Sequence, residues 1–299
     1  MDSTKYKSLS DKVVDVINYS ILLILAVVTL YPMLYVLFAS VSNPVLFKMH
    51  QFVILLKPLG FQLDAYKLVF QNPMIVRGFL NTLIYMCGGV AISMAITFLG
   101  AYALSRKGYA LKRFFTFAIM FTMYFSGGLV PTFLWVMQMG MLDTVWAILL
   151  PNALSTYNMI VMRTALAAIP PSLEESAKID GANDFTVMVR IMLPLCIPTI
   201  AVVGLWYSVG RWNEWFNAVI YLRTRVLFPI QLILREILIT GTAESMAASA
   251  ASGSADDLTA VRELLKYAAI IITTVPILFI YPFIQKYFVQ GMMLGSVKE

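Results

Sequence analysis

The 299 residues are 60% hydrophobic and 13% charged, with a formal net charge of +6 and a mean hydropathy of +0.80, whereas soluble domains carry about 25% charged residues. Most of the surface is therefore expected to face lipid, and Lys and Arg in cytoplasmic loops explain the basic charge without a nucleic-acid partner. Two cysteines and one histidine exclude a disulfide framework and a Cys/His metal cluster.

Six membrane spans are predicted in chain order, each built on an uncharged apolar run long enough to cross a hydrocarbon core of roughly 30 Å. They cover residues 17–41, 79–105, 114–139, 144–168, 191–216 and 265–288. The predicted fold class is all-α integral membrane protein, with residues 1–299 forming a single transmembrane domain. The first run exceeds the apolar core of a signal peptide, which is about 7–15 residues, so we expect it to be retained.

The short connections predict the orientation of the spans, because Lys and Arg summed over all connections do not decide it. The connection between the second and third spans is rich in Lys and Arg, whereas the turn around Asp143 has none. Short basic loops are typical of the cytoplasmic side. Both chain ends are therefore predicted to be cytoplasmic, with long outer segments at 43–77 and 222–265 and a long inner loop at 169–190.

A short, rigid helix is predicted within the inner loop. Ser172 and Glu175 have the spacing of a capping box, which starts a helix at Ser172. Pro170 and Pro171 are expected to prevent an earlier start, and Gly181 supplies the left-handed residue that ends a helix. The same residues could equally cap a surface helix that has no partner.

A second helix is predicted to follow this loop and to run into the fifth span. Asn183 or Asp184 can cap its start. Pro194 and Pro198 lie inside the apolar run and must be accommodated by kinks or by a first helical turn.

The stretch EESAKIDGANDFTVMVRIMLP resembles the EAA loop of ATP-binding-cassette (ABC) importer permeases, a cytoplasmic loop with the pattern E-A-A, G and I-x-L-P. The matching positions are Glu175, Ala177, Asp180, Gly181, Ile191, Leu193 and Pro194. Ser176 replaces the middle alanine. In that family the helix is a coupling helix that docks into a cleft on the ATP-binding subunit.

The resemblance implies an ATPase-coupling role for seven residues of this loop. Leu173, Ala177 and Ile179 would face the cleft, and Glu174, Glu175 and Asp180 would make its polar contacts, with Gly181 ending the helix.

Four further stretches resemble the MalG type of sugar permease: AYALSRKG from Ala101, the segment Gly127–Pro151, RWNEWFNAVIYL from Arg211, and the final QGMMLGSVKE. The sequence of the fifth span is similar to that of the family branch that imports oligosaccharides from plant or algal polysaccharides in Gram-positive bacteria. The resemblance implies a type I ABC importer permease fold of six helices in a bacterial cell membrane. It also implies a second homologous permease, two ATP-binding subunits and an extracellular sugar-binding protein.

The sequence contains no G-x-x-x-x-G-K-[ST] motif, so this chain is not expected to hold ATP phosphates in a P-loop. ATP and magnesium are therefore expected only in the partner subunits. No cofactor is predicted in this chain, and it is predicted not to be an enzyme.

Polar and aromatic residues of the third to fifth spans are candidates for a substrate path, because sugars are held by hydrogen bonds and by stacking on rings. They are Tyr124, Asn152, Tyr157, Asn158, Arg211, Trp212, Asn213 and Glu214. Structural alternatives exist for all of them: Trp is typical of membrane interfaces, Arg211 and Glu214 can pair with each other, and intramembrane polar groups often bond between helices. Gly88, Gly89, Ser93 and Gly100 are expected to permit close helix packing.

Two other function classes fit the sequence less well than an oligosaccharide importer. A secondary, ion-coupled transporter would need mid-membrane ionisable residues, and the spans are almost free of charge. An intramembrane enzyme would need a Ser/His pair, paired intramembrane aspartates or a zinc motif, and His50 lies in a loop. Arg211 is compatible with an acidic oligosaccharide, although a neutral one fits as well.

Overall fold

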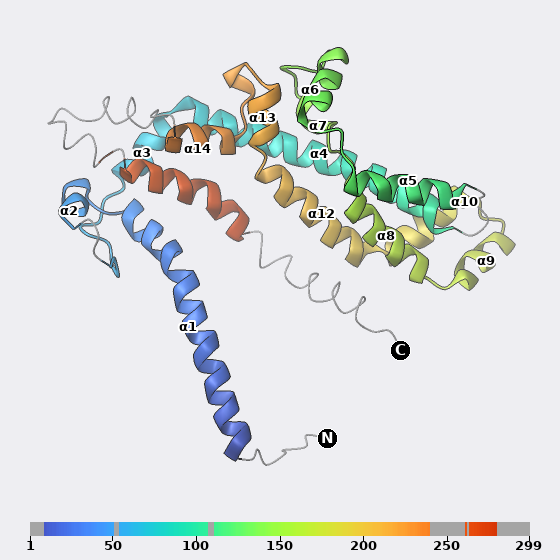
Figure 1. Ribbon diagram of the computed structural model, residues 1–299, viewed down its shortest axis with the longest axis horizontal. Helices are drawn as coiled ribbons and strands as arrows, with labels where there is room; N and C mark the ends of the chain where they lie inside the picture. Colours follow the sequence, from blue (N-terminus) through green and yellow to red (C-terminus); the bar gives the residue numbers. More distant parts are fainter. Residues whose placement is uncertain (1–8, 51–53, 107–110, 240–260, 262, 280–299) are drawn as a thin grey trace. The chain divides into compact units, whose positions relative to one another are not determined.

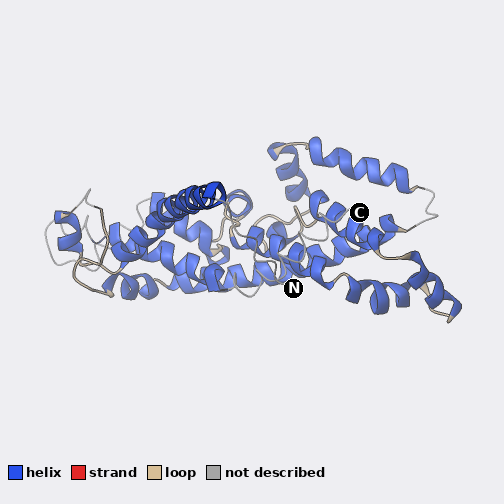
Figure 2. Cartoon of the chain, turned by 90° about the horizontal axis from the view of Figure 1, so that it is seen from below, coloured by secondary structure: helices blue, strands red, loops and turns tan. Residues whose placement is uncertain are grey.

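The computed structural model describes residues 9–50, 54–106, 111–239, 261 and 263–279, and all regular secondary structure in these ranges is helical (Figures 1 and 2). The chain divides into two compact units. The first comprises Met1–Gln71 and Ile237–Ile272, and the second comprises Asn72–Glu236 and Thr273–Glu299. The single transmembrane domain predicted from the sequence stays a prediction.

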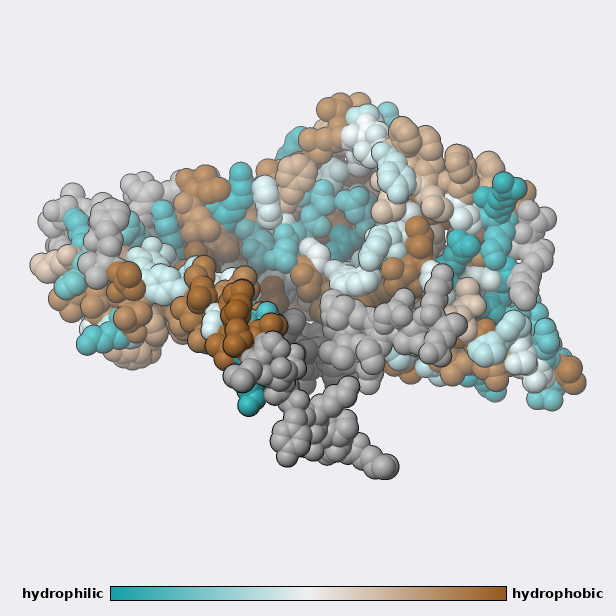
Figure 3. Space-filling view, turned by 60° about the horizontal axis from the view of Figure 1, so that its bottom comes forward, coloured by the Kyte–Doolittle hydropathy of each residue, from teal (hydrophilic) through white to brown (hydrophobic). Residues whose placement is uncertain are grey.

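The first unit contains α1 (Leu9–Ser40), α2 (Pro44–Met49), α3 (Asp64–Gln71) and the start of a helix over residues 263–279. α1 is long and apolar enough to cross a membrane from Lys12 to Ser40, as predicted, and none of its most apolar stretch is buried. Apolar residues accordingly cover much of the visible surface in Figure 3. A small core of Ala39, Phe47, Leu55 and Leu264 holds this unit together.

The second unit is built on α4 (Pro73–Ser105), which also meets the length and hydropathy of a membrane span. α8 (Thr156–Ala168) and α12 (Ile197–Trp212) pack against it. Buried residues of these three helices, together with Ala177 and Val187, form the largest apolar cluster that we describe. The core of the unit therefore lies along the second half of α4.

The predicted third span, 114–139, is not one helix. α5 (Lys112–Tyr124) and α6 (Leu129–Gln138) meet at 115°. Gly128 between them has φ +85°, a left-handed conformation that no continuous right-handed helix contains.

The predicted fourth span, 144–168, is also interrupted. α7 (Trp146–Leu149) ends early, and α8 begins only at Thr156. Asn152 between them has φ +62°, and Pro151 has no N–H to continue a helical ladder. The prediction of one continuous helix over this apolar run is therefore wrong.

The predicted fifth span, 191–216, is not one helix: the chain bends inside it, between Leu195 and Ile197, and its main helix ends at Trp212. α10 (Asp184–Val187), a π-helical turn (Met188–Met192) and α11 (Leu193–Leu195) run together, and α12 then turns by 80° from them. Pro198 stands in the first turn of α12, where the missing N–H leaves no bond unmade, and Pro194 follows the π-helical turn directly before the bend. Both expected ways of accommodating these prolines, a bend and a first helical turn, are therefore present.

Short helices follow. α13 (Phe216–Tyr221) lies directly before the predicted outer segment, and a 3₁₀ turn (Arg225–Leu227) and α14 (Ile230–Ile239) lie within it. The predicted sixth span, 265–288, is helical as far as residue 279, and residues 280–288 lie outside the described ranges. Among the described residues, two helices are long and apolar enough to cross a membrane, or up to four if each bent pair counts as one span. Six spans and cytoplasmic chain ends stay predictions.

Candidate coupling helix and the polar contacts around it

The short rod predicted in the inner loop is α9 (Pro171–Ile179). Pro170 occupies the position before the helix, Pro171 is its first residue, and no side chain caps its start. The predicted capping box of Ser172 and Glu175 is therefore wrong. The reason is that proline suits the first helical position, where its fixed φ is already helical and its missing N–H costs nothing.

The end of α9 follows the prediction. Gly181 has φ +83°, its N–H donates to the carbonyl of Lys178 (3.1 Å), and the N–H of Ala182 donates to the carbonyl of Ala177 (2.9 Å). This pair of bonds is a Schellman motif, which ends a helix at a left-handed residue. The side chain of Asn183 then accepts from the N–H of Thr186 at 2.8 Å, so Asn183 caps α10.

The residues expected to couple to an ATPase lie on two faces of α9. Ala177 is buried in the core of the second unit, so its expected position in a partner's cleft is wrong: its small side chain lets α9 pack against its own chain. Leu173, Glu175, Ile179, Asp180 and Gly181 are exposed, Ile179 to 86%. Phe185 on α10, which the sequence prediction missed, is exposed as well.

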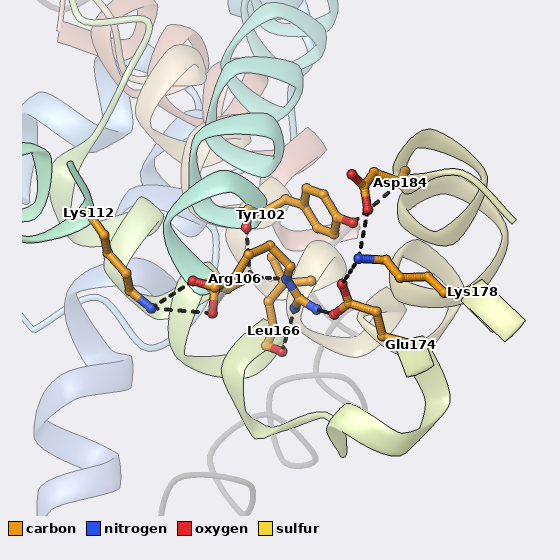
Figure 4. A network of polar contacts seen from close by, with 8 residues as sticks. Tyr102, Arg106, Lys112, Leu166, Glu174, Lys178 and Asp184 are labelled. Atoms are coloured by element: carbon orange, nitrogen blue, oxygen red, sulfur yellow. Dashed lines mark hydrogen bonds and ion pairs between the residues drawn. The ribbon is translucent and has the colours of Figure 1, made fainter. Parts of the chain in front are cut away.

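Glu174, which was expected to make polar contacts in a partner's cleft, instead faces its own chain and enters a network of polar contacts (Figure 4). Its Oε2 accepts from Nη1 of Arg106, the residue at which α4 ends, and its Oε1 pairs with Nζ of Lys178 at 3.0 Å. Lys178 also reaches Oδ1 of Asp184 at 3.0 Å. We call Arg106, Glu174, Lys178 and Asp184 the α9 anchor.

Neighbouring groups hold Arg106 in place. Its guanidinium lies over the ring of Tyr102, 4.9 Å from the centroid, and its Nη2 donates to the carbonyl of Leu166 at 3.3 Å. The hydroxyl of Tyr102 donates to the carbonyl of Asp184 at 3.2 Å. The α9 anchor thus joins the end of α4 to α8, α9 and α10.

Electrostatics keep both central members of the anchor charged at neutral pH. Burial by itself opposes ionisation of Glu174, but hydrogen bonds from Lys178 and Arg106 outweigh it and lower the pKa of this carboxyl. The pKa of Lys178 is raised, first by its bond to Asp184 and then by Glu174.

Two candidates for the substrate path have structural roles. Arg211 is 5% exposed and donates to the carbonyls of Ile148 (2.6 Å) and Leu149 (3.1 Å), while its Nη1 lies 3.7 Å from Oε2 of Glu214. A Cβ on Gly89 would stand 2.8 Å from Nε of Arg211, which confirms close packing at that glycine. The pairing of Arg211 with Glu214 is the structural alternative recognised in the sequence.

Trp212 is buried too. Its Nε1 donates to the carbonyl of Thr273 at 3.2 Å, and its ring meets Phe79 edge to face at 5.7 Å. Neither Arg211 nor Trp212 offers its polar group to a substrate here.

The other candidates are spread over several elements. Tyr124, Asn152, Tyr157 and Asn213 are exposed, Glu214 is half-buried and Asn158 is buried. The ring of Tyr157 lies 5.5 Å from that of Trp206.

The sequence does not reveal a set of buried and partly buried contacts between distant segments. The hydroxyl of Tyr207 on α12 pairs with Oγ1 of Thr97 on α4 at 2.7 Å and accepts from the N–H of Ser155 at 3.0 Å. Near the start of α4, Nδ2 of Asn81 donates to the carbonyls of Val226 (2.7 Å) and Phe228 (3.0 Å). No local pattern predicts bonds between residues so far apart in sequence.

A turn at Asp143 is held in the same way. Asp143 has φ +58°, and its carboxylate accepts from the N–H groups of Arg223 and Thr224, both at 2.8 Å, and from Oγ1 of Thr224 at 2.6 Å. These bonds, that of the Thr224 hydroxyl first, lower the pKa of Asp143.

Comparison with known proteins gives consistent matches along the chain. Residues 96–294 match the family described as "Binding-protein-dependent transport system inner membrane component". The chain is 38% identical over 291 residues to the polygalacturonan/rhamnogalacturonan transport system permease protein YtcP of Bacillus subtilis (strain 168), which covers 97% of this chain and 100% of that protein. It is 36% identical to protein LplC of the same organism, over 99% of this chain and 98% of that protein.

A solved structure is also similar. A chain in the crystal structure of a bacterial ABC transporter involved in the import of the acidic polysaccharide alginate matches with a TM-score of 0.87 and 32% identity, over 95% of this chain and 100% of that chain.

Proposed function

The chain belongs to the family of binding-protein-dependent transport system inner membrane components, and on that premise we propose that it is the permease subunit of an ABC importer for acidic oligosaccharides. The proposed substrate class rests on two similar proteins. One is named for polygalacturonan and rhamnogalacturonan, and the other belongs to a transporter of the acidic polysaccharide alginate. The family match gives no support to a secondary transporter.

The observation that carries the coupling mechanism is α9, a nine-residue helix between a proline start and a Schellman end. Its exposed side carries Leu173, Glu175 and Ile179, an apolar pair with an acidic neighbour. Such a surface fits a cleft on an ATP-binding subunit that offers apolar walls and basic groups. Under this proposal two such subunits supply ATP and magnesium, and this chain performs no covalent chemistry.

The proposed assembly adds a second homologous permease and an extracellular sugar-binding protein, with both ends of this chain in the cytoplasm. When the ATP-binding subunits close, they push α9. Because α9 is joined to α8 by a tight turn and to α12 through α10 and α11, the push reaches the helices packed on α4. The path then opens alternately to the two sides of the membrane.

Among the substrate-path candidates, the exposed Tyr124, Asn152, Tyr157 and Asn213 remain our proposed contacts. We also propose Trp215, which follows the 211–214 segment, and Arg235, whose guanidinium lies 4.8 Å from the centroid of the half-exposed Trp215 ring. An aromatic ring that can stack on the face of a sugar, next to a cation that can pair with a carboxylate, suits a uronic-acid unit.

Transport by the assembled complex tests the substrate class. The complex in lipid vesicles is given oligogalacturonides, alginate oligosaccharides or maltooligosaccharides of matched length, with the cognate binding protein present. We expect at least one acidic oligosaccharide to stimulate ATP hydrolysis several-fold and to accumulate inside. The methyl ester of the same oligogalacturonide is the matched neutral control. Equal stimulation by the ester would contradict an acidic substrate, and ATP-independent uptake would contradict the importer.

Replacement of one exposed residue tests the docking surface of α9. Ile179→Asp places a charge where we propose an apolar contact, so we expect loss of sugar-stimulated ATPase activity with normal membrane insertion. Ile179→Leu keeps the apolar contact and is expected to behave as wild type. Full stimulation in Ile179→Asp would rule out this docking surface.

A further inference from the structure

The position of Arg106 separates two possible roles for this side chain. Arg106 lies at the end of α4. One possible role of a cation at that point is simply to satisfy the last carbonyls of the helix. Those carbonyls have another partner: Nζ of Lys112 donates to the carbonyls of Arg106 (3.1 Å) and Ser105 (3.4 Å). The Arg106 guanidinium is directed away from them, toward Glu174 and the carbonyl of Leu166.

The partner of Arg106 lies on the inner face of α9. Glu174, Ala177 and Lys178 are three and four residues apart and so share one side of the helix. Ala177 packs into the core, and Glu174 and Lys178 complete the anchor beside it. The opposite side carries Glu175 and Ile179, which are exposed. One face of α9 is thus fixed to its own chain while the other is left for a partner.

The environment of the ion pair makes it more than a loose surface contact. The side chains of Arg106 and Glu174 are 19% and 18% exposed, so solvent screens their attraction less than that of an exposed pair. Nε of Arg106 also donates to Oγ of Ser105 at 3.0 Å, and the ring of Tyr102 supports the guanidinium. A planar group with several fixed partners is pre-organised for one position of Glu174.

We propose that Arg106 is a positioning residue for coupling, which fixes α9 to the end of α4 through Glu174 so that a push on α9 moves α4 as well as the two helices joined to it by the backbone. This inference rests on the proposed function of α9. The α9 anchor supplies a second, non-covalent route between the docking surface and the helix on which the second unit is built.

Single and double substitutions test this route. Arg106→Gln and Glu174→Gln each remove the ion pair and keep a polar side chain, and we expect each to lower sugar-stimulated ATPase activity about tenfold while basal ATPase activity stays within twofold of wild type. The double variant is expected to be no worse than either single variant, because all three lack the same interaction. Arg106→Lys, which keeps the charge but loses the planar fork, should fall between wild type and Arg106→Gln. Arg113→Gln, an exposed basic residue nearby, is the matched control and should keep full stimulation.

Two results would overturn the positioning role. One is additive loss in the double variant, and the other is normal stimulation in both single variants of a complex whose wild type responds to sugar. That second result would leave the proposed function intact.

A distance measurement tests the anchor without transport. Spin labels at Ser176→Cys on α9 and Leu99→Cys on α4, after replacement of Cys87 and Cys196, report how firmly the two helices are joined. We expect one narrow distance distribution in the otherwise unchanged complex and in Arg113→Gln, and a clearly broader one in Arg106→Gln. Equal widths in all three would contradict the anchor even if no sugar were found to stimulate the complex.

Discussion

The two ends of α4 are held by different chemistry. In its first half, Asn81 and Tyr85 donate to backbone carbonyls of the 226–228 segment, and Thr82 accepts from the N–H of Ile230 at 2.9 Å. At the middle of the helix, Gly89 lies against the buried Arg211, which itself binds two backbone carbonyls. At its other end, Arg106 pairs with the side chain of Glu174, within a network that includes the exposed Asp184.

This difference separates a fixed contact from an adjustable one. The bonds of Thr82 and Arg211 are buried, and a buried backbone group that loses its partner has no water to replace it, so these contacts are costly to break. The Arg106–Glu174 pair joins two side chains that are 19% and 18% exposed, so it can shift together with α9 without breaking a backbone hydrogen bond. The first end is therefore suited to hold a constant structure, and the second to follow a partner.

The largest effect is expected from Arg211→Met. It removes two charge-assisted bonds to the carbonyls of Ile148 and Leu149, each worth about 1.5–3 kcal/mol. We expect the yield of assembled complex and its thermal unfolding temperature to fall strongly, with Arg211→Lys intermediate. If Arg211→Met assembled as stably as wild type and lost only uptake, Arg211 would be a substrate contact and the contrast between the two ends would fail.

A smaller effect, of about 1–2 kcal/mol, is expected from Gly181→Ala, because an L-residue is disfavoured in the left-handed conformation. Gly140→Ala is a matched control, since both glycines have positive φ and open space around the added Cβ. Similar losses in unfolding temperature are expected for the two variants, but only Gly181→Ala should reduce sugar-stimulated ATPase activity. Equal coupling defects would show that general destabilisation, rather than the position of α9, controls the response.

The smallest effect is expected at the Asp143 turn. Its pKa is lowered by three accepted hydrogen bonds, so its stabilisation is complete above the ordinary Asp pKa of about 4 and is lost only as the pH falls through the lower folded value. The contribution of Asp143 to stability should therefore not change with pH between about pH 5 and 8. Asp143→Asn tolerates the left-handed backbone and should change the unfolding temperature less than Asp143→Ala. Thermal unfolding across that pH range checks both statements.

Local chemistry explains what could be predicted from the sequence. Gly181 and Asn183 act on backbone groups a few residues away, so the end of α9 and the start of α10 were predictable. Arg106 and Glu174 are 68 residues apart, and nothing in the sequence near either residue identifies the other as its partner.

The apolar runs predicted membrane-compatible helices but not their continuity. Hydropathy does not distinguish a straight helix from two helices with a bend between them, so the prediction of one continuous helix is wrong for the third, fourth and fifth spans. The neighbouring Gly127 and Gly128, and Pro151 before Asn152, were the available signals. Arg211 shows a different limit: the sequence around it is compatible both with substrate binding and with pairing inside the chain.

The wide turn at Met188–Met192 has a consequence for how this chain can vary in length. A π-helical turn commonly reflects one residue added to an α-helix, and Met188 and Met192 both point into the core. Deleting a single residue there would restore regular α-helical bonding but rotate everything before it by about 100°. Exposed side chains such as Val189 can be replaced. The number of residues between Gly181 and Pro194, by contrast, sets the direction in which α9 points and must stay constant.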